Sequence, residues 1–150
     1  MRAVLQRVNK ASVSVGGKIV GQCDKGWFVL LGVTHSDTSD DVDYLVQKIV
    51  GLRGFGDEQD RMNLSVQDIN GGLLVISQFT LYGTLSRGRR PSFSEAASPE
   101  HANALYEAFV AQIRERGLPL GTGIFGAKMT ITAECDGPVT FFLDSQISPT

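Results

Sequence analysis

The chain has 150 residues, of which 42% are hydrophobic and 20% charged, and its formal net charge is −2. Domains typically hold about 100–200 residues, so this length predicts one domain over residues 1–150, large enough to fold without a metal or disulfide staple. The composition argues against disorder, and the near-balanced charge argues against a sequence-independent nucleic-acid coat, whose affinity comes from many phosphate contacts.

The first part of the chain is predicted to form strands. Ala3–Val8 is apolar and branched, and Ala11–Val15 alternates apolar and polar residues with a period of two. The Gly16–Gly17 pair is a hairpin turn signal, after which Lys18–Cys23 returns as a strand. Trp27–Val33 is apolar throughout, which predicts a strand buried on both faces.

The hydrophobic period then changes to that of a helix. Thr38 or Ser39 is a suitable N-cap, and Gly51 is a C-terminal stop. Between them, apolar residues recur on one helical face: Val42, Leu45, Val46, Ile49 and Val50.

The middle of the chain is expected to alternate short strands with loops. Strands are predicted near Leu52–Phe55 and over Leu64–Val66, and Leu73–Ile76 is an apolar strand that runs on to Thr80. No regular element is predicted for Thr84–Ala97, and a loop of this length in a small domain is usually functional or mobile. The loop carries three arginines: Arg87, Arg89 and Arg90.

A second helix is predicted after this loop. Ser98 is its N-cap, Pro99 takes the first helical position, and Gly117 ends it. Its apolar stripe consists of Ala102, Leu105, Phe109, Val110 and Ile113. Strands are expected over Lys128–Glu134 and Val139–Leu143, and the mixture of hairpins and helical crossovers predicts an α/β fold.

Signals for membrane insertion and secretion are missing from the sequence. No apolar run approaches the roughly 20 residues that span a bilayer, and Met1–Lys10 lacks the apolar stretch and cleavage site of a signal peptide. Two cysteines, Cys23 and Cys135, are too few for a disulfide framework or a zinc cage. We therefore expect a cytoplasmic protein with no membrane association, in which both thiols are reduced and structural.

Few residues are suited to side-chain catalysis. The sequence lacks the GxSxG nucleophile elbow, the P-loop and the HExxH zinc motif. Of the two histidines, His35 is interpreted as a loop-capping residue, with a catalytic base as the alternative, and His101 as a solvated helix residue. No metal site is predicted, because each distant segment supplies only one imidazole.

Two polar segments remain as candidates. Ser77–Thr80 ends an apolar strand, where backbone amides that leave a sheet are free to bind a ligand as an oxyanion hole. Ordinary turn residues are the alternative interpretation of this segment. Asp136–Val139 separates two predicted strands, and Pro138 removes a ladder donor, so a tight turn is its simplest interpretation.

Taken together in order and spacing, several segments resemble the D-aminoacyl-tRNA deacylase family. The resemblance extends over nearly the whole chain. It rests mainly on Ser77–Gly83, Arg90–Phe93, Gly123–Met129 and Asp136–Thr140, and also on Met1–Val8, Gly32–Thr38 and Met62–Val66. It implies a single compact barrel-like domain of mixed β-sheets flanked by two main helices, which works as a homodimer with its sites at the interface. No metal or organic cofactor is expected.

The resemblance also implies an activity. The chain would hydrolyse the ester that joins a D-amino acid to the terminal adenosine of tRNA, as a proofreading step in translation. It would also release glycine mischarged on tRNA and would spare L-aminoacyl-tRNA. The expected partner is therefore the 3′ end of a tRNA that carries a D-amino acid or glycine.

The catalytic motif that the resemblance implies consists of Ser77, Gln78, Phe79 and Thr80. In the family's arrangement, the amides of Phe79 and Thr80 would hold the ester carbonyl oxygen. Because an aminoacyl ester is already activated, positioning and oxyanion stabilisation suffice, and the tRNA's own 2′-hydroxyl would help to activate water. A covalent Thr80 nucleophile is the alternative mechanism, although no residue near it in the sequence would act as its base.

The implied substrate-binding residues come from other segments. Gly137 and Pro138 match a Gly-cis-Pro motif that is inserted into the partner subunit's pocket, and Arg7 matches a residue that orients this motif. The terminal adenosine and the pocket wall would involve Ala102, Phe125 and Met129.

Two other functions are compatible with the sequence. One is a small-molecule amino-acid esterase, and the other is a non-catalytic RNA-binding module. The module is less favoured because the aromatic residues lie mostly inside apolar runs, where they offer no stacking platform. The three arginines of the Thr84–Ala97 loop are either phosphate contacts or solvated residues.

Overall fold

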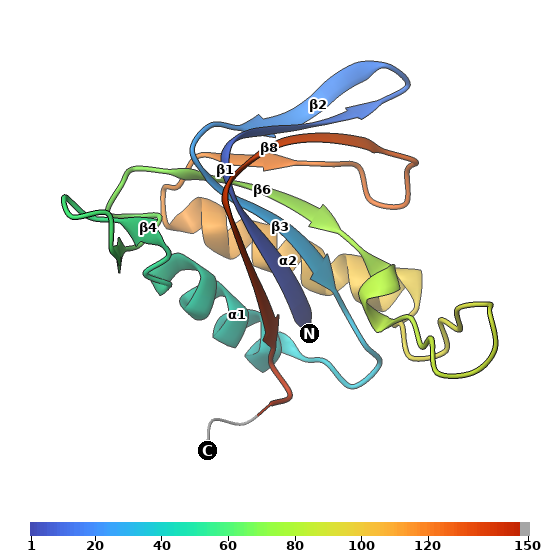
Figure 1. Cartoon of the computed structure of the whole chain (residues 1–150). Coiled ribbons are helices and arrows are strands. Elements are labelled where there is room, and N and C mark those ends of the chain that lie inside the picture. Colours follow the sequence, from blue (N-terminus) through green and yellow to red (C-terminus); the bar gives the residue numbers. More distant parts are fainter. Residues whose placement is uncertain (148–150) are drawn as a thin grey trace.

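A long first strand, β1 (Arg2–Val15), organises the main sheet of the structure, a computed structural model that describes residues 1–147. Along one side, β1 pairs antiparallel with β3 (Gly26–Gly32) over its first half and with β2 (Lys18–Cys23) over its second half. Along its other side, β1 pairs antiparallel with β8 (Thr130–Asp144), as Figure 1 shows.

The sheet continues from β3 through two parallel strands. β6 (Gly72–Ser77) pairs with β3, and β7 (Leu120–Thr122) pairs with β6, which gives the order β2-β1-β3-β6-β7. The sheet curls until β2 meets β7, where a Cβ atom at Gly21 would lie 2.1 Å from the carbonyl oxygen of Thr122. Only glycine permits so close a backbone approach, and the result is a nearly closed, barrel-like mixed sheet.

Three shorter elements complete the fold. β4 (Phe55–Gly56) and β5 (Met62–Leu64) form a separate two-stranded sheet. A short 3-10 helix, η1 (Phe79–Tyr82), follows β6 directly.

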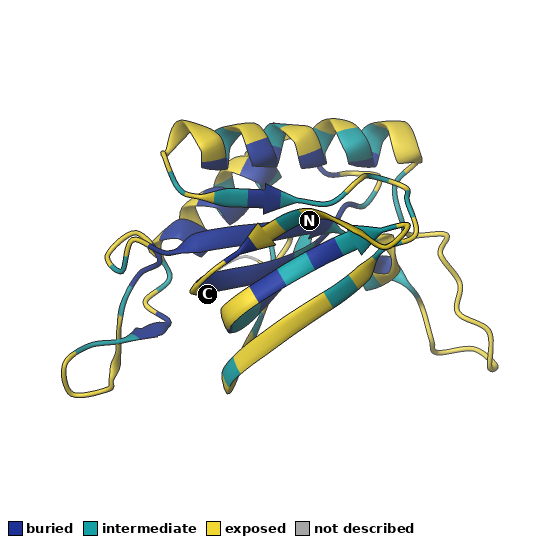
Figure 2. Ribbon diagram, turned by 90° about the horizontal axis from the view of Figure 1, so that it is seen from above, coloured by how far each residue is buried: buried dark blue, intermediate teal, exposed yellow. Residues whose placement is uncertain are grey.

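Two helices cover one face of the main sheet. The first, α1 (Ser39–Gly51), begins with a capping box. The Thr38 side chain accepts a hydrogen bond from the helix backbone, and the Asp41 carboxylate accepts one from the Thr38 amide. The second, α2 (Pro99–Glu115), begins after Ser98, which accepts from the His101 amide. Figure 2 shows the buried side of the helices turned toward the sheet. Both predicted helices and the α/β fold class are therefore confirmed.

The hydrophobic residues form two clusters on opposite sides of β1. Ala3 and Leu5 pack with both helices, whereas Val8, Ala11 and Val13 pack inside the curled sheet. A strand alternates its faces with a period of two, so Leu5 and Val8 point to opposite faces. Register shifts relative to β8 on both sides of Val8 then keep Ala11 and Val13 on the same side as Val8.

Several predicted boundaries were wrong, although not at the start of the chain. The opening is one strand, as predicted, because the exposed polar residues between Ala3–Val8 and Ala11–Val15 continue the pairing with β8. Lys128–Glu134 and Val139–Leu143 likewise belong to one strand, β8, so the turn expected at Asp136–Val139 is absent. The short strands near 52–55 and 64–66 lie at Phe55–Gly56 and Met62–Leu64, and β7 was not predicted. On α2, Tyr106 is buried and Leu105 only half-buried.

No helix within residues 1–147 is both long and apolar enough to cross a membrane.

Candidate active site

The carboxyl end of β6 leaves two backbone amides without acceptors. Gln78 donates its amide to the Leu31 carbonyl oxygen at 2.8 Å, which holds the chain to β3 as it turns into η1. Phe79 and Thr80 are the first residues of η1, where amides have no partner inside the helix. Across residues 1–147, neither amide donates to another backbone group. This arrangement can bind a carbonyl oxygen that acquires negative charge.

A cavity of about 560 Å³ opens beside Phe79, whereas Thr80, the next residue, does not line it. Its size falls within the range of small-molecule sites, about 300–1,000 Å³. Six of the residues singled out from the sequence line it: Ser77, Gln78, Phe79, Ala102, Phe125 and Met129. Segments far apart in the chain thus meet here, from the end of β6, from α2 and from the loop that follows β7.

Sequence reasoning missed much of the cavity wall. Val33, Ala96, Ala97 and Ala127 also line the cavity, and they are small or branched apolar residues without any chemical signature. The only signal that pointed to Ala96 and Ala97 was their place at the end of the long irregular loop.

Aromatic packing fixes two sides of the cavity. The ring of Phe79 meets the ring of Phe93 edge-on, with centroids 5.0 Å apart. Phe125 packs 6.1 Å from Tyr106, whose hydroxyl donates to the Val75 carbonyl oxygen at 2.8 Å. Burial raises the pKa of Tyr106 to about 12, so this hydroxyl stays protonated and serves as an anchor.

Thr80 has an amide rather than a base as its side-chain neighbour. The Gln78 side chain donates through Nε2 to Thr80 Oγ1. A hydroxyl becomes a nucleophile when a neighbouring base accepts its proton, and an amide N–H cannot do so. In the described part of the chain, no carboxylate or imidazole is hydrogen-bonded to this hydroxyl.

The second group of predicted residues lies elsewhere. Gly137, in a cis peptide bond with Pro138, has a φ of +116°, in the region that favours glycine. Arg7 donates through Nη1 to the Gly54 carbonyl oxygen at 2.9 Å, and its Nε lies 3.2 Å from Asp136 Oδ2. A Cβ atom on Gly137 would lie 3.3 Å from Arg7 Nη2, so the guanidinium packs directly against the backbone of Gly137.

The structure does not bring these two groups together within one chain. Arg7 and Gly137 line a separate, polar cavity of about 440 Å³, whose other polar residues are Lys25, Asp57, Asp60 and Asp136. Neither Gly137 nor Pro138 lines the cavity beside Phe79.

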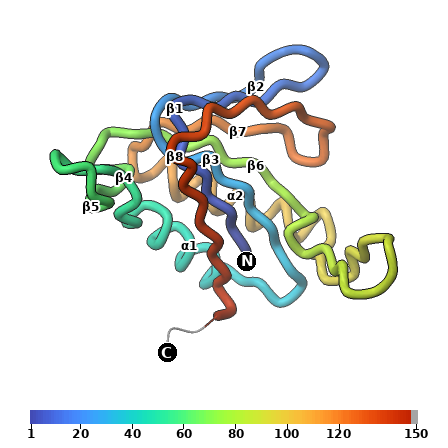
Figure 3. Tube along the Cα trace, viewed as in Figure 1, coloured from blue at the N-terminus to red at the C-terminus, as the bar shows by residue number. Residues whose placement is uncertain are grey.

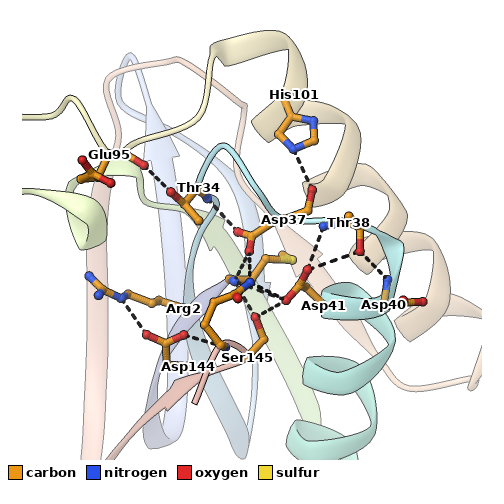
Figure 4. Close-up of polar contacts among 12 residues, drawn as sticks. Arg2, Thr34, Asp37, Thr38, Asp40, Asp41, Glu95, His101, Asp144 and Ser145 are labelled. Carbon is orange, nitrogen blue, oxygen red and sulfur yellow. Dashed lines mark hydrogen bonds and ion pairs between the residues drawn. The ribbon is translucent and has the colours of Figure 1, made fainter. Parts of the chain in front are cut away.

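A buried ion pair lies next to Thr34, the residue that follows Val33 of the larger cavity, and Figure 4 shows its contacts. The Asp37 side chain accepts from the Met1 ammonium at 2.6 Å and from the Thr34 amide at 2.7 Å. The Thr34 hydroxyl in turn donates to the Glu95 carbonyl oxygen. The neighbouring Ala97 amide donates to Val33 at 3.0 Å, so the wall is tied to the strand end.

This cluster also includes the carboxyl group of Asp41, whose pKa it lowers. Burial alone would raise the pKa of Asp41, but hydrogen bonds from Ser145 and Thr38, together with the nearby Met1 ammonium, lower it below its usual value.

The histidines and cysteines have mainly structural contacts. His35 donates to the Ser94 carbonyl oxygen at 2.7 Å, as expected for a loop-capping residue. His101, expected to be solvated, instead donates to the Asp37 carbonyl oxygen at 2.9 Å. Burial raises the pKa of Cys23 to about 11, whereas Cys135 is exposed. Within residues 1–147, no three metal-ligand side chains gather into a candidate metal site.

Comparisons with known proteins agree over the whole chain. Residues 4–144 match the family model of D-Tyr-tRNA(Tyr) deacylase. A D-aminoacyl-tRNA deacylase of Thermus aquaticus is 54% identical over 149 residues, covering 99% of this chain and 98% of the relative. A D-aminoacyl-tRNA deacylase of Clostridioides difficile (strain 630) is 57% identical over 148 residues, covering 99% of each.

Solved structures share the fold. The c-Myc DNA Unwinding Element Binding Protein superimposes with a TM-score of 0.91 at 39% identity, covering 100% of both chains. A probable eukaryotic D-amino acid tRNA deacylase superimposes with a TM-score of 0.80, covering 95% of this chain and 97% of the other. At 18% identity, the second match speaks for the fold alone.

Proposed function

The chain belongs to the D-Tyr-tRNA(Tyr) deacylase family, and from this premise we propose that it is a proofreading hydrolase that cleaves the ester between a D-amino acid and the terminal adenosine of tRNA. It also releases glycine from mischarged tRNA, leaves L-aminoacyl-tRNA intact, and works in the cytoplasm as a single domain. The observation that carries the proposal is the pair of free amides, at Phe79 and Thr80, next to a cavity of about 560 Å³.

The chain's own groups account for the proposed reaction. The ester carbonyl oxygen accepts hydrogen bonds from the Phe79 and Thr80 amides, which stabilise the negative charge that develops as water attacks. Phe125 and Met129 pack against the terminal adenosine, whose 2′-hydroxyl helps to activate the water. Because the ester is an activated substrate, this mechanism needs no side-chain nucleophile.

A second copy of the chain completes the proposed site. Among the described strands, β8 pairs only with β1, so its other edge has backbone groups free for pairing. Phe142 on β8 is 56% exposed, and Ile131 of the same strand lines the larger cavity. A partner that packs on this strand buries Phe142 and carries its own Gly137 and Pro138 to the mouth of the cavity. Sedimentation of the purified chain measures this association.

Hydrolysis of charged tRNAs tests the proposal. We expect D-tyrosyl-tRNA to be deacylated at least ~100-fold faster than L-tyrosyl-tRNA, because a clash at the α-carbon excludes the L side chain. Glycyl-tRNA, which has no side chain to clash, is expected to be deacylated as well. Equal rates on tRNA esters and on free amino-acid esters would instead identify a small-molecule esterase. Binding of tRNA without hydrolysis would identify an RNA-binding module.

Replacing Thr80 by Ala is expected to leave deacylation of D-tyrosyl-tRNA within ~10-fold of the unmodified chain, because the backbone amide remains. Removal of a hydroxyl nucleophile costs on the order of 10⁶-fold in kcat in a serine hydrolase, so the two mechanisms are well separated. Single-turnover kinetics measure the rate, and Ser39→Ala, which removes an exposed hydroxyl at the start of α1, is the control. Accumulation of an acyl adduct on Thr80, seen by mass spectrometry, would contradict this mechanism.

A further inference from the structure

Residues 84–92 form an exposed loop that projects from the end of the molecule where the larger cavity lies. Thr84 and Ser92 close its base with paired backbone hydrogen bonds of 2.7 and 3.0 Å. All residues between them are exposed, and Figure 3 shows this yellow-green segment standing away from the sheet and helices. We call this segment the arginine loop.

The arginine loop is the most cationic part of an otherwise slightly acidic chain. Arg87, Arg89 and Arg90 lie within four positions, and residues 79–94 contain no acidic residue, although the whole chain has a net charge of −2. Gly88, with a φ of +65°, makes the tight turn between Arg87 and Arg89. Within residues 1–147, the three guanidinium groups make no ion pair with a carboxylate, so their charge is available to a ligand.

The base of the arginine loop packs against Phe79, one of the residues that line the cavity. Phe93 follows directly after Ser92, and its ring packs against that of Phe79. The Gly83 amide, just before the loop, donates to the Thr80 carbonyl oxygen at 2.9 Å. The loop therefore stands at a fixed place beside the free amides.

From this arrangement we propose that the arginine loop binds the phosphodiester backbone of the substrate tRNA where its acceptor end leaves the cavity. The inference rests on the proposed function, because that function places the terminal adenosine in the cavity. Guanidinium groups bind phosphate through two parallel hydrogen bonds, which suits three arginines on a short loop. Such contacts attract any tRNA sequence to a chain that is otherwise slightly acidic.

The test compares two substrates and two triple variants. One variant is Arg87→Gln/Arg89→Gln/Arg90→Gln. The matched control is Lys48→Gln/Arg114→Gln/Arg116→Gln, which removes the same charge from exposed positions. Arg114 lies in the last turn of α2, whose first turn is at the cavity, and Lys48 lies in the last turn of α1 (Figure 1).

The substrates are D-tyrosyl-tRNA and the ester of D-tyrosine with adenosine, which has no phosphate. For the loop variant, we expect the ratio of kcat/KM on tRNA to kcat/KM on the short ester to fall by ~10–100-fold, mainly through KM. The control triple should leave this ratio within about twofold. The slope of log kcat/KM against log salt concentration on tRNA should become shallower by about one to three in the loop variant only.

Equal ratios and equal salt slopes in the two triple variants would overturn the proposal and leave the loop a solvated segment. Failure of the proposed function is a separate result, since the unmodified chain would then hydrolyse neither substrate, or would hydrolyse both at equal rates as a small-molecule esterase does. Circular dichroism of each variant verifies that its fold is intact.

Discussion

Replacing Arg7 by Ala is expected to lower the ratio of D- to L-aminoacyl-tRNA hydrolysis by at least ~10-fold, while D-aminoacyl-tRNA is still hydrolysed. The ester and the amine are common to both enantiomers, so a site that distinguishes them must act on the direction of the side chain at the α-carbon. Exclusion by a fixed group achieves this, and a backbone carbonyl is better fixed than a side chain that can change rotamer.

The contacts of Arg7 explain why it controls this fixed group. Its guanidinium is held by the Gly54 carbonyl oxygen and by Asp136, and it packs against Gly137. Its side chain is only 15% exposed, whereas the Asp136 side chain is 39% exposed, so solvent screens the ion pair in part. Without the guanidinium, Gly137 loses the neighbour that limits its movement, and the L side chain meets a yielding surface instead of a rigid one.

The measurement is the ratio of initial deacylation rates on D- and L-tyrosyl-tRNA. Lys10→Ala is the matched control, because Lys10 is another β1 cation that faces a β8 carboxylate, Glu134, at 3.8 Å, yet it is 72% exposed. The control should leave the ratio unchanged. An unchanged ratio in a folded, dimeric Arg7→Ala protein would show that Arg7 does not hold the chiral filter.

Asp37→Asn is expected to destabilise the chain by about 3–5 kcal/mol, the usual effect of removing one partner from a buried ion pair. The Asp37 and Met1 side chains are both 0% exposed, and the carboxylate lies 2.6 Å from the Met1 ammonium. Asparagine removes the compensating charge and places an amide against two donors, the Met1 ammonium and the Thr34 amide. The buried ammonium then keeps only the more distant Asp41 carboxylate, at 4.0 Å, as a counter-charge.

Equilibrium unfolding in urea, followed by circular dichroism, measures this effect. Asp40→Asn is the control, because Asp40 is exposed in the first turn of α1 and interacts mainly with the helix dipole, an effect of about 0.3–1 kcal/mol. Similar losses of stability in the two variants would show that the buried pair contributes no more than a surface carboxylate does.

Local rules in the sequence predicted the helices and the buried strand. Thr38 and Ser98 cap their helices as expected, because capping depends on residues only a few positions away. The Trp27–Val33 run correctly predicted a strand buried on both faces, since the apolar run itself records that burial.

Strand continuity was predicted for the opening of the chain but not for its end. Asn9 and Lys10 are polar and exposed, yet β1 runs through them because β8 pairs along both halves of the strand. Pro138 appears to end a strand, but β8 continues through it. Both outcomes depend on partners more than 100 residues away, which no local pattern contains.

The motifs in the sequence were enough to identify the family, and the family indicates the kind of reaction. The sequence also identified Phe79, Ala102 and Phe125, which the fold then gathers around one cavity. Two placements became known from the fold alone: Arg7 and Gly137 lie at a different cavity, and Asp37 is buried against the Met1 ammonium. The physical reason is that these placements follow from how β1, β8 and α1 pack together, and packing joins residues that are distant in the chain.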